Sequence, residues 1–244
     1  MIEVERVYKS FDQPVLRGCS LRVKRAEIVG VIGPPASGKS VLLRAIAGLE
    51  QLDAGSICVD GRELLDAPEA VLTQVRGQIG MLFQHVALFD FMSVFENVAF
   101  PLRRMSRLPE SEIERRVRAE LDAVGLSELG SRMPAGLSGG QKRRVGIARA
   151  AITGPRVLLY DEPAAGLDPV TSSRAFLLLK EQRRRLGASI LVVSSDIDRL
   201  LAVVDSVAMM HHGRILFQGS PAALLAAQAP IISQFVQGRA DGPL

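Results

Sequence analysis

The hydrophobic and polar positions of the chain follow two different periods. Over residues 1–32, β-branched and polar residues alternate, and turn signals interrupt them at 12–14 and 17–18. This alternation predicts short strands of a β-rich edge. Unbroken apolar runs of strand length follow at residues 28–32, 157–160, 189–193 and 206–210. Such runs are typical of strands in a parallel sheet that is covered on both faces.

Helical periodicity replaces the strand pattern from about residue 84 to residue 151. Within 112–125, apolar residues recur at helical spacing, and a proline and a glycine bracket the segment. The apolar positions are Ile113, Val117, Leu121 and Val124, with Pro109 and Gly125 as start and stop signals. A further helical stretch at 171–185 separates two of the strands. Strands alternating with helices predict a mostly parallel, doubly wound α/β sheet, here interrupted by a helical insertion.

Composition narrows the class of protein. The 244 residues, 48% hydrophobic and 23% charged, suffice for one globular domain with a substantial insertion. A net charge of +4 fits polyphosphate binding or an anionic membrane surface, and equally an ordinary mixed surface. Cys19 and Cys58 lack metal-ligand spacing and are expected to be core residues in a reducing compartment. The N-terminus mixes acids and bases, so no signal peptide is expected, and no apolar run approaches the ~20 residues of a membrane span.

A glycine-rich segment follows the first apolar run and precedes a helical stretch at 41–48. Gly33-Pro34-Pro35-Ala36-Ser37-Gly38-Lys39-Ser40 matches G-x-x-x-x-G-K-[ST]. Backbone N–H groups of such a loop, here including Gly33, Ser37 and Gly38, converge on phosphate at a helix N-terminus. Lys39 is expected to reach the β- and γ-phosphates and Ser40 to bind Mg²⁺. The alternative, a glycine turn with a chance lysine, does not explain the strand before the loop and the helix after it.

Two acids end the apolar run at 157–160. Asp161 at the end of a strand is placed to bind Mg²⁺, and Glu162 beside it to polarise an attacking water. Two acids after a strand more often cap a helix when they occur alone. Together with the phosphate loop, they favour the catalytic interpretation.

The segment Leu137-Ser138-Gly139-Gly140-Gln141 opens a basic helical stretch twenty positions before Asp161. With it the sequence resembles ABC-transporter ATPases, whose signature is LSGGQ. Two glycines allow close approach of the backbone, and a helix N-terminus favours a γ-phosphate. The resemblance implies that Ser138, Gly139, Gly140 and Gln141 cap the ATP held by the glycine loop of a second copy, so that the active unit is a homodimer.

The resemblance covers nearly the whole chain and implies further site residues. Gln84 would sense Mg²⁺ and water and couple to the membrane subunits. Asp168, in Gly166-Leu167-Asp168, would communicate across the dimer. Phe11 would stack on adenine, although an aromatic residue in an edge strand is otherwise usually core and Tyr8 lies close by.

The sequence departs from the family at a histidine. The strand at 190–193 leads into Ser194-Ser195-Asp196, where the family has Ser-His-Asp with a histidine that contacts the γ-phosphate. Ser195 is shorter and carries no charge near neutral pH. Loss of one such contact is expected to slow hydrolysis by about a hundredfold or more, unless the hydroxyl and a water fill the role. His211 and His212 are expected in a turn and not as substitutes.

The glycine loop also differs from the family pattern, but to a smaller extent. Pro35 and Ala36 stand where the family usually has serine and glycine. Proline removes an N–H donor and fixes φ, which predicts a somewhat lower nucleotide affinity.

The predicted architecture is one ABC ATPase domain over residues 1–244. A P-loop NTPase, RecA-like core with a mostly parallel sheet and an N-terminal antiparallel β subdomain occupies 1–84 and 152–220. A helical signature subdomain occupies 85–151, and a C-terminal tail 221–244.

The expected function is ATP hydrolysis that energises a membrane transporter. Residues 81–89 and 94–102 and the tail at 235–243 look like the ATPases of Mla/Mce-type phospholipid transporters. This implies a location on the cytoplasmic face of a bacterial inner membrane, with membrane permease subunits, a small soluble accessory subunit as a further candidate partner, and no nucleic acid. Apolar residues after Gln84 suit a groove for a short permease helix, although Phe89, Phe91 and Phe95 could equally pack the insertion.

Two other functions stay open. The first is a non-transport ABC ATPase of DNA repair or translation, for which long coiled-coil insertions or a second ATPase unit would be expected. The second is a nucleotide-switched regulatory module with little turnover, which only Ser195 favours.

Overall fold

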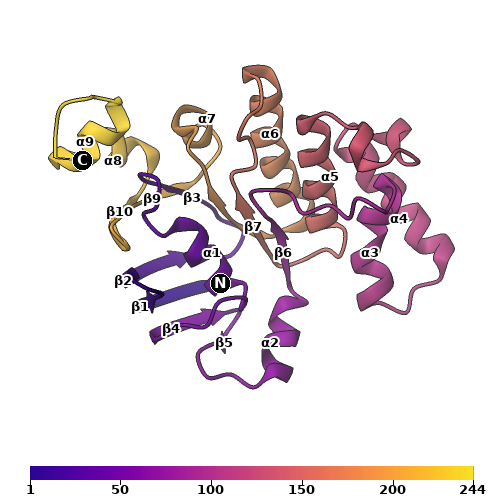
Figure 1. Cartoon of the computed structure of the whole chain (residues 1–244), viewed down its shortest axis with the longest axis horizontal. Coiled ribbons are helices and arrows are strands. Elements are labelled where there is room, and N and C mark those ends of the chain that lie inside the picture. Colours follow the sequence, from indigo (N-terminus) through magenta and orange to yellow (C-terminus); the bar gives the residue numbers. More distant parts are fainter. Residues whose placement is uncertain (244) are drawn as a thin grey trace.

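The computed structural model describes residues 1–243, and a six-stranded sheet runs through the middle of the molecule (Figure 1). Its strand order is β10-β9-β3-β8-β7-β6. Five strands are parallel, and only β10 runs antiparallel, beside β9. Every residue of β3, β7 and β8 is buried, as expected for apolar runs covered on both faces. The strands are β3 (Ile28–Ile32), β6 (Ile79–Leu82), β7 (Val157–Asp161), β8 (Ser189–Val193), β9 (Ser206–His211) and β10 (Arg214–Gly219).

A four-stranded antiparallel sheet lies to one side, in the order β2-β1-β4-β5. Alternating residues of its strands are buried, which accounts for the alternation in the N-terminal sequence. The two long strands pair as a hairpin and are longer than the short strands that the sequence predicts. The strands are β1 (Ile2–Ser10), β2 (Pro14–Val23), β4 (Ala54–Val59) and β5 (Arg62–Glu63).

Three helices form the insertion at the opposite end of the molecule (Figure 1). They are α3 (Val94–Met105), α4 (Glu110–Ala123) and α5 (Gly139–Ala151). Helix α4 starts directly after Pro109 and buries Ile113, Val117 and Leu121, the positions that the periodicity selects. Short 3₁₀ turns at Ser127–Leu129 and Pro134–Gly136 lead from α4 to α5.

The remaining helices of the core are α1 (Lys39–Ile46), α2 (Glu69–Arg76), α6 (Pro169–Leu186) and α7 (Ile197–Leu201). Helix α6 is somewhat longer than the predicted 171–185, because Asp168 caps its start and Gly187, at φ 63°, ends it. Near its C-terminus, Arg185 forms an ion pair of 2.6 Å with the buried Glu120 of α4. Helix α6 thus bridges the core and the helical insertion.

The C-terminal tail is folded onto the end of the core. It forms α8 (Pro221–Leu225) and α9 (Pro230–Gln237). Leu224 is 1% exposed and Ile232 5% exposed, and both belong to the main hydrophobic cluster. Among residues 1–243, no helix combines the length and the apolarity that a membrane span requires.

One glycine of the core makes a testable close approach. A Cβ added to Gly80 of β6 would lie 1.9 Å from the carbonyl oxygen of Ala150 in α5. We expect Gly80→Ala to lower the free energy of unfolding by about 2 kcal/mol through overpacking, measured by urea denaturation. At Gly136 an added Cβ meets nothing within 4 Å. Gly136→Ala should therefore be nearly neutral, and equal losses in the two variants would contradict the prediction.

Candidate active site

The glycine loop connects β3 to α1 and is fixed from behind by the β9–β10 turn. Gly33 adopts φ 147°, and a Cβ there would lie 2.0 Å from the carbonyl oxygen of Met210. Gly38 adopts φ 105° at the start of α1. The N–H of Gly213 donates to the carbonyl of Ser37 at 3.0 Å. Both glycines are therefore required by the backbone, and the loop is held in one shape.

Lys39 points back into this loop. Its Nζ donates to the carbonyl oxygens of Gly33 at 2.8 Å and Pro34 at 2.7 Å, and to Ser37 Oγ at 3.3 Å. Burial lowers the pKa of Lys39, whereas the charges of Glu162 and Asp161 raise it. A cation enclosed by a loop at a helix N-terminus is suited to bind phosphate oxygens.

Ser40 and Asp161 lie together at the end of β7. Ser40 Oγ donates to Asp161 Oδ1 at 3.1 Å. Burial raises the pKa of Asp161, and the bond from Ser40 opposes this. Within residues 1–243, no group of three or more His, Cys, Asp or Glu side chains could hold a metal ion. Mg²⁺ commonly binds one or two carboxylates together with water and substrate phosphates, so this hydroxyl–carboxylate pair fits it.

Glu162 and Ser195 contact each other directly. Both the backbone N–H and the hydroxyl of Ser195 donate to Glu162 Oε2, each at 3.1 Å. Glu162 itself adopts φ 52°, a conformation that non-glycine residues rarely occupy. The sequence places Ser195 where a phosphate contact is expected, whereas in this structure its hydroxyl holds the carboxylate of Glu162.

Two alternatives from the sequence are settled by the geometry. The acids at 161–162 do not cap a helix, because α6 begins at Pro169 and Asp168 is its cap. His211 ends β9 and His212, at φ 47°, occupies the following turn, with ring centroids 4.0 Å apart. The turn position is confirmed for His212, whereas His211 belongs to the strand.

The signature segment forms the start of α5. Ser138 Oγ accepts from the N–H of Gln141 at 3.2 Å, and Gln141 Oε1 accepts from the N–H of Ser138 at 2.8 Å, which is a capping box. Ser138 and Gly139 are exposed, and Gly140 lies close to Thr171 of α6. Helix α5 packs against α3, α4, α6 and β6. The glycine loop lies elsewhere, between β3 and α1.

The side chains of Phe11, Asp168 and Gln84 form no hydrogen bond with the site residues Lys39, Ser40, Asp161, Glu162 and Ser195. Phe11 is 54% exposed in the turn after β1, with Lys9 Nζ 5.1 Å from its ring centroid, so it is not a core residue. The carboxylate of Asp168 accepts from the N–H groups of Val170 and Thr171 at 3.0 Å. Its pKa is lowered first by the Thr171 side chain and then by these N–H groups. Gln84 is exposed two residues after β6.

Sequence reasoning missed two arginines of α5. Arg143 Nη1 donates to the carbonyl oxygens of Glu162 at 2.9 Å and Gln84 at 3.2 Å. Arg149 donates to the carbonyls of Val86 and Ala87, which adopt φ values of 61° and 49°. No motif could reveal these contacts, because main-chain carbonyls are available at every residue type.

A groove of about 410 Å³ lies beside the segment that follows Gln84. Its aromatic and apolar lining includes Phe83, Phe89, Phe100 and Met105, and the rings of Phe89 and Phe100 are 4.9 Å apart. Phe95 packs against the core, as the packing alternative expects, whereas Phe91 is 76% exposed.

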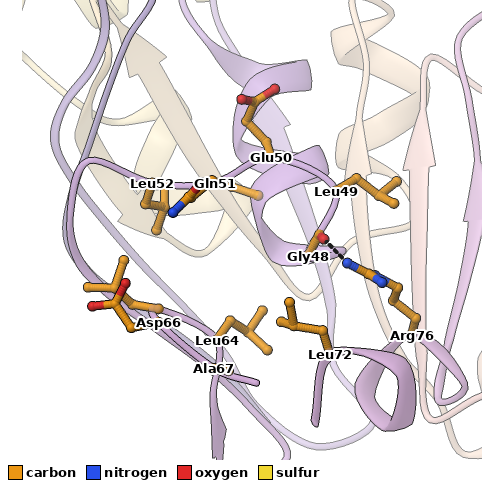
Figure 2. A pocket seen from close by; sticks show the side chains of 12 residues that line it. Gly48, Leu49, Glu50, Gln51, Leu52, Leu64, Asp66, Ala67, Leu72 and Arg76 are labelled. Carbon is orange, nitrogen blue, oxygen red and sulfur yellow. Dashed lines mark hydrogen bonds between the residues drawn. The ribbon is translucent and has the colours of Figure 1, made fainter. Parts of the chain in front are cut away.

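A hollow of about 360 Å³ lies at the opposite end of α1 from Lys39 (Figure 2). Leu49, Leu64 and Leu72 line it, and Arg76 donates to the carbonyl of Gly48 at 2.7 Å. Glu50 and Asp66 also belong to its lining, and the Glu50 carboxylate points away from Leu64 and Leu72. The lining contains no residue of the glycine loop and neither Asp161 nor Glu162, so this hollow is separate from the candidate site.

One of the two residues at which the glycine loop differs from the family pattern, Ala36, has an unusual backbone conformation. Ala36 adopts φ 58°, which costs a residue with a Cβ about 1 kcal/mol relative to glycine. We expect Ala36→Gly to raise the free energy of unfolding by about 1 kcal/mol by relieving this strain, measured by urea denaturation. Ala165→Gly, outside the loop, is the control. An equal gain in that variant would show that strain at Ala36 is not the cause.

A doubly wound parallel sheet with a glycine loop after β3 and acids at the end of β7 defines a P-loop nucleotide hydrolase. The model of the family described as "ABC transporter" matches residues 16–165. The chain belongs to this family, and the predicted fold class is confirmed.

The names of individual proteins with similar sequences agree with this family assignment. The chain is 41% identical over 243 residues to the methionine import ATP-binding protein MetN 1 of Salmonella paratyphi A, covering 97% of this chain and 71% of that protein. It is 40% identical over 239 residues to MetN of Brucella abortus, covering 97% and 64%. These names do not support the expectation of phospholipid transport.

Solved structures show the same architecture. A dimeric, post-hydrolysis state of the ATP-binding cassette MJ0796 bound to ADP and Pi has a TM-score of 0.85 and 29% identity, covering 91% of this chain and 99% of that one. CbiO1 from Clostridium perfringens, part of the ABC transporter complex cbiONQ, has a TM-score of 0.84 and 33% identity, covering 98% and 95%. Such cassettes bind ATP with Mg²⁺, dimerise, and pair with membrane permease subunits. The chain is an ATPase whose hydrolysis is coupled to transport.

Proposed function

We propose that two copies of this chain associate head to tail, with each ATP between the glycine loop of one copy and residues 138–141 of the other. The observation that carries the proposal is the exposed, capped N-terminus of α5, which lies apart from the glycine loop of its own chain. A helix N-terminus favours an anion, and two glycines let it approach closely. The dimeric cassette with bound ADP and Pi supports this arrangement.

Within each composite site, Lys39 and the N–H groups of the loop would hold the β- and γ-phosphates. Ser40, Asp161 and Gln84 would hold Mg²⁺, which neutralises charge on the phosphates. Phe11 would offer its exposed ring face to adenine. Glu162 would accept the proton of the attacking water.

Ser195 would act on hydrolysis through Glu162. Its two bonds to Oε2 orient the carboxylate but supply no imidazole toward the γ-phosphate. In a homodimer both sites carry this serine, so neither compensates for the other. We therefore propose slow turnover. Asp168 would report the state of one site to the other copy.

The groove beside Gln84 would receive a short helix of the permease on the cytoplasmic face of the membrane. Its aromatic lining supports this, because an amphipathic helix binds by inserting apolar side chains. We place the helical signature subdomain at 85–151, the core at 1–84 and 152–220, and the tail at 221–244. A small soluble accessory subunit is a further candidate partner, and no nucleic acid takes part.

The transported substrate would be bound by the permease and not by this chain. The names of the relatives favour methionine import. The likeness of residues 81–89, 94–102 and 235–243 to phospholipid-transport ATPases favours a lipid as the second candidate.

Purification of the tagged chain from detergent-solubilised membranes tests the proposal. We expect a permease to co-purify and MgATP turnover to respond, in proteoliposomes, to methionine or to phospholipid, which distinguishes the two substrates. Recovery with nucleic acid would indicate a repair or translation ATPase. Recovery without a permease and without turnover would indicate a regulatory module; either result would overturn the proposal.

A further inference from the structure

One guanidinium joins three segments of the candidate site. Arg143 lies in the first turns of α5, two residues after Gln141, the last of the signature residues. Its Nη1 donates to the carbonyl oxygen of Glu162 at 2.9 Å and to that of Gln84 at 3.2 Å. One Nη nitrogen carries two hydrogens, so both are used. The side chain thus connects α5, the end of β7 and the segment after β6.

The backbone of Glu162 is strained and is held in place by hydrogen bonds from neighbouring segments. Glu162 adopts φ 52°, and a strained conformation persists only where its surroundings hold it. Its N–H donates to the carbonyl of Val193 at 3.0 Å, and its carbonyl accepts from Arg143 at 2.9 Å and, more weakly, from the N–H of Ala165 at 3.3 Å. The carboxylate is then held by Ser195. Without Arg143, the carbonyl side of this residue loses its charged partner.

We propose that Arg143 is a positioning residue for hydrolysis: it fixes the backbone of Glu162, and through it the carboxylate, relative to the segment that begins at Gln84. The proposal rests on the proposed function of Glu162 as the base. A shift of the Gln84 segment, which borders the aromatic groove, would reach the carbonyl of Glu162 through this side chain, in addition to the pairing of β6 with β7. Arg143 contacts neither phosphates nor water in this role; it acts through Glu162.

Arg144 provides a matched control in the same helix. Its Nη1 donates to the carbonyl oxygens of Val124 at 3.0 Å and Gly125 at 3.2 Å, at the end of α4. Arg143 and Arg144 therefore lie in the same helix, and each donates two hydrogen bonds to main-chain carbonyl oxygens. Only the acceptors differ, because those of Arg144 lie outside the candidate site.

The experiment compares Arg143→Gln with Arg144→Gln in purified protein. We expect Arg143→Gln to lower kcat roughly 10- to 100-fold, part of what a general base contributes, with KM for ATP within about twofold because the phosphate contacts remain. Arg144→Gln should keep kcat within about twofold while lowering the melting temperature. Arg143→Lys should give an intermediate kcat, because an ammonium keeps the charge but not the planar geometry.

Several results would overturn the inference. Equal losses of kcat in the two glutamine variants would show a purely structural role, as would a higher KM for ATP with unchanged kcat. If Arg143→Gln does not fold, the ratio of kcat between Arg143→Lys and Arg144→Lys decides, and a ratio near one refutes the inference. ATP-driven dimerisation in a Glu162→Gln background is measured in parallel. Its absence, with no turnover in the unmodified protein, would refute the proposed function instead.

Discussion

Replacement of Glu162 by glutamine should lower the ATP turnover number by at least about a hundredfold, the smaller end of what a general base contributes. Glutamine has nearly the same shape and can still accept from Ser195, so the glycine loop and the Ser40–Asp161 pair should stay intact. ATP binding should therefore persist. With hydrolysis blocked, MgATP should hold the protein as a stable dimer.

Two measurements check this result: steady-state phosphate release, and size-exclusion chromatography with and without MgATP. Glu114→Gln is the control, since Glu114 lies on an exposed part of α4 with only a 3.8 Å ion pair to Arg118. A variant that hydrolyses ATP at the normal rate would exclude Glu162 as the base. A variant that neither retains ATP nor dimerises would contradict the composite site.

Introduction of histidine at position 195 should raise turnover by up to about a hundredfold, the size of a single transition-state contact. Ser195 lies exposed two residues after β8, so a larger side chain can extend toward the site. The backbone N–H at 195 would still donate to Glu162. An imidazole adds a longer donor that can carry charge.

The variant Ser195→Ala measures what the serine hydroxyl itself contributes to turnover. It removes the hydroxyl bond to Glu162 Oε2 and keeps the N–H bond, so turnover should fall only a few-fold, about the value of one hydrogen bond. Single-turnover kinetics with γ-labelled ATP separates hydrolysis from product release. No gain in Ser195→His, together with a large loss in Ser195→Ala, would show that serine already fulfils the role.

The central sheet could be predicted from the sequence because its strands are buried on both faces. Runs such as 157–160 and 189–193 are apolar throughout, and every residue of β7 and β8 is buried. The edge strand β10 has only a partly buried face, and α8 and α9 are short. Their packing depends on distant residues, which is why the tail could not be foreseen as helical.

The residues of the site could be predicted individually, but their contacts could not. The glycine loop and the acids at 161–162 have fixed spacing and residue type. The bond between Ser195 and Glu162 joins residues 33 positions apart, and that between Arg143 and Gln84 joins residues 59 apart. The second uses a main-chain oxygen, which no sequence pattern marks. Phe11 shows the converse, since a hairpin turn exposes an aromatic ring that the sequence alone would more often place inside.

Helix α6 gives the two ends of the molecule a mechanical connection. Asp168 holds its first turn, and Arg185 is paired with the buried Glu120 of α4 near its last turn. Its 18 residues span about 27 Å as a stiff rod. A displacement of Asp168 by a neighbouring copy would therefore tilt the rod and move α4 at its far end. ATP bound at one catalytic centre would then change the orientation of the helical layer. The two catalytic centres of the assembly would therefore not act independently.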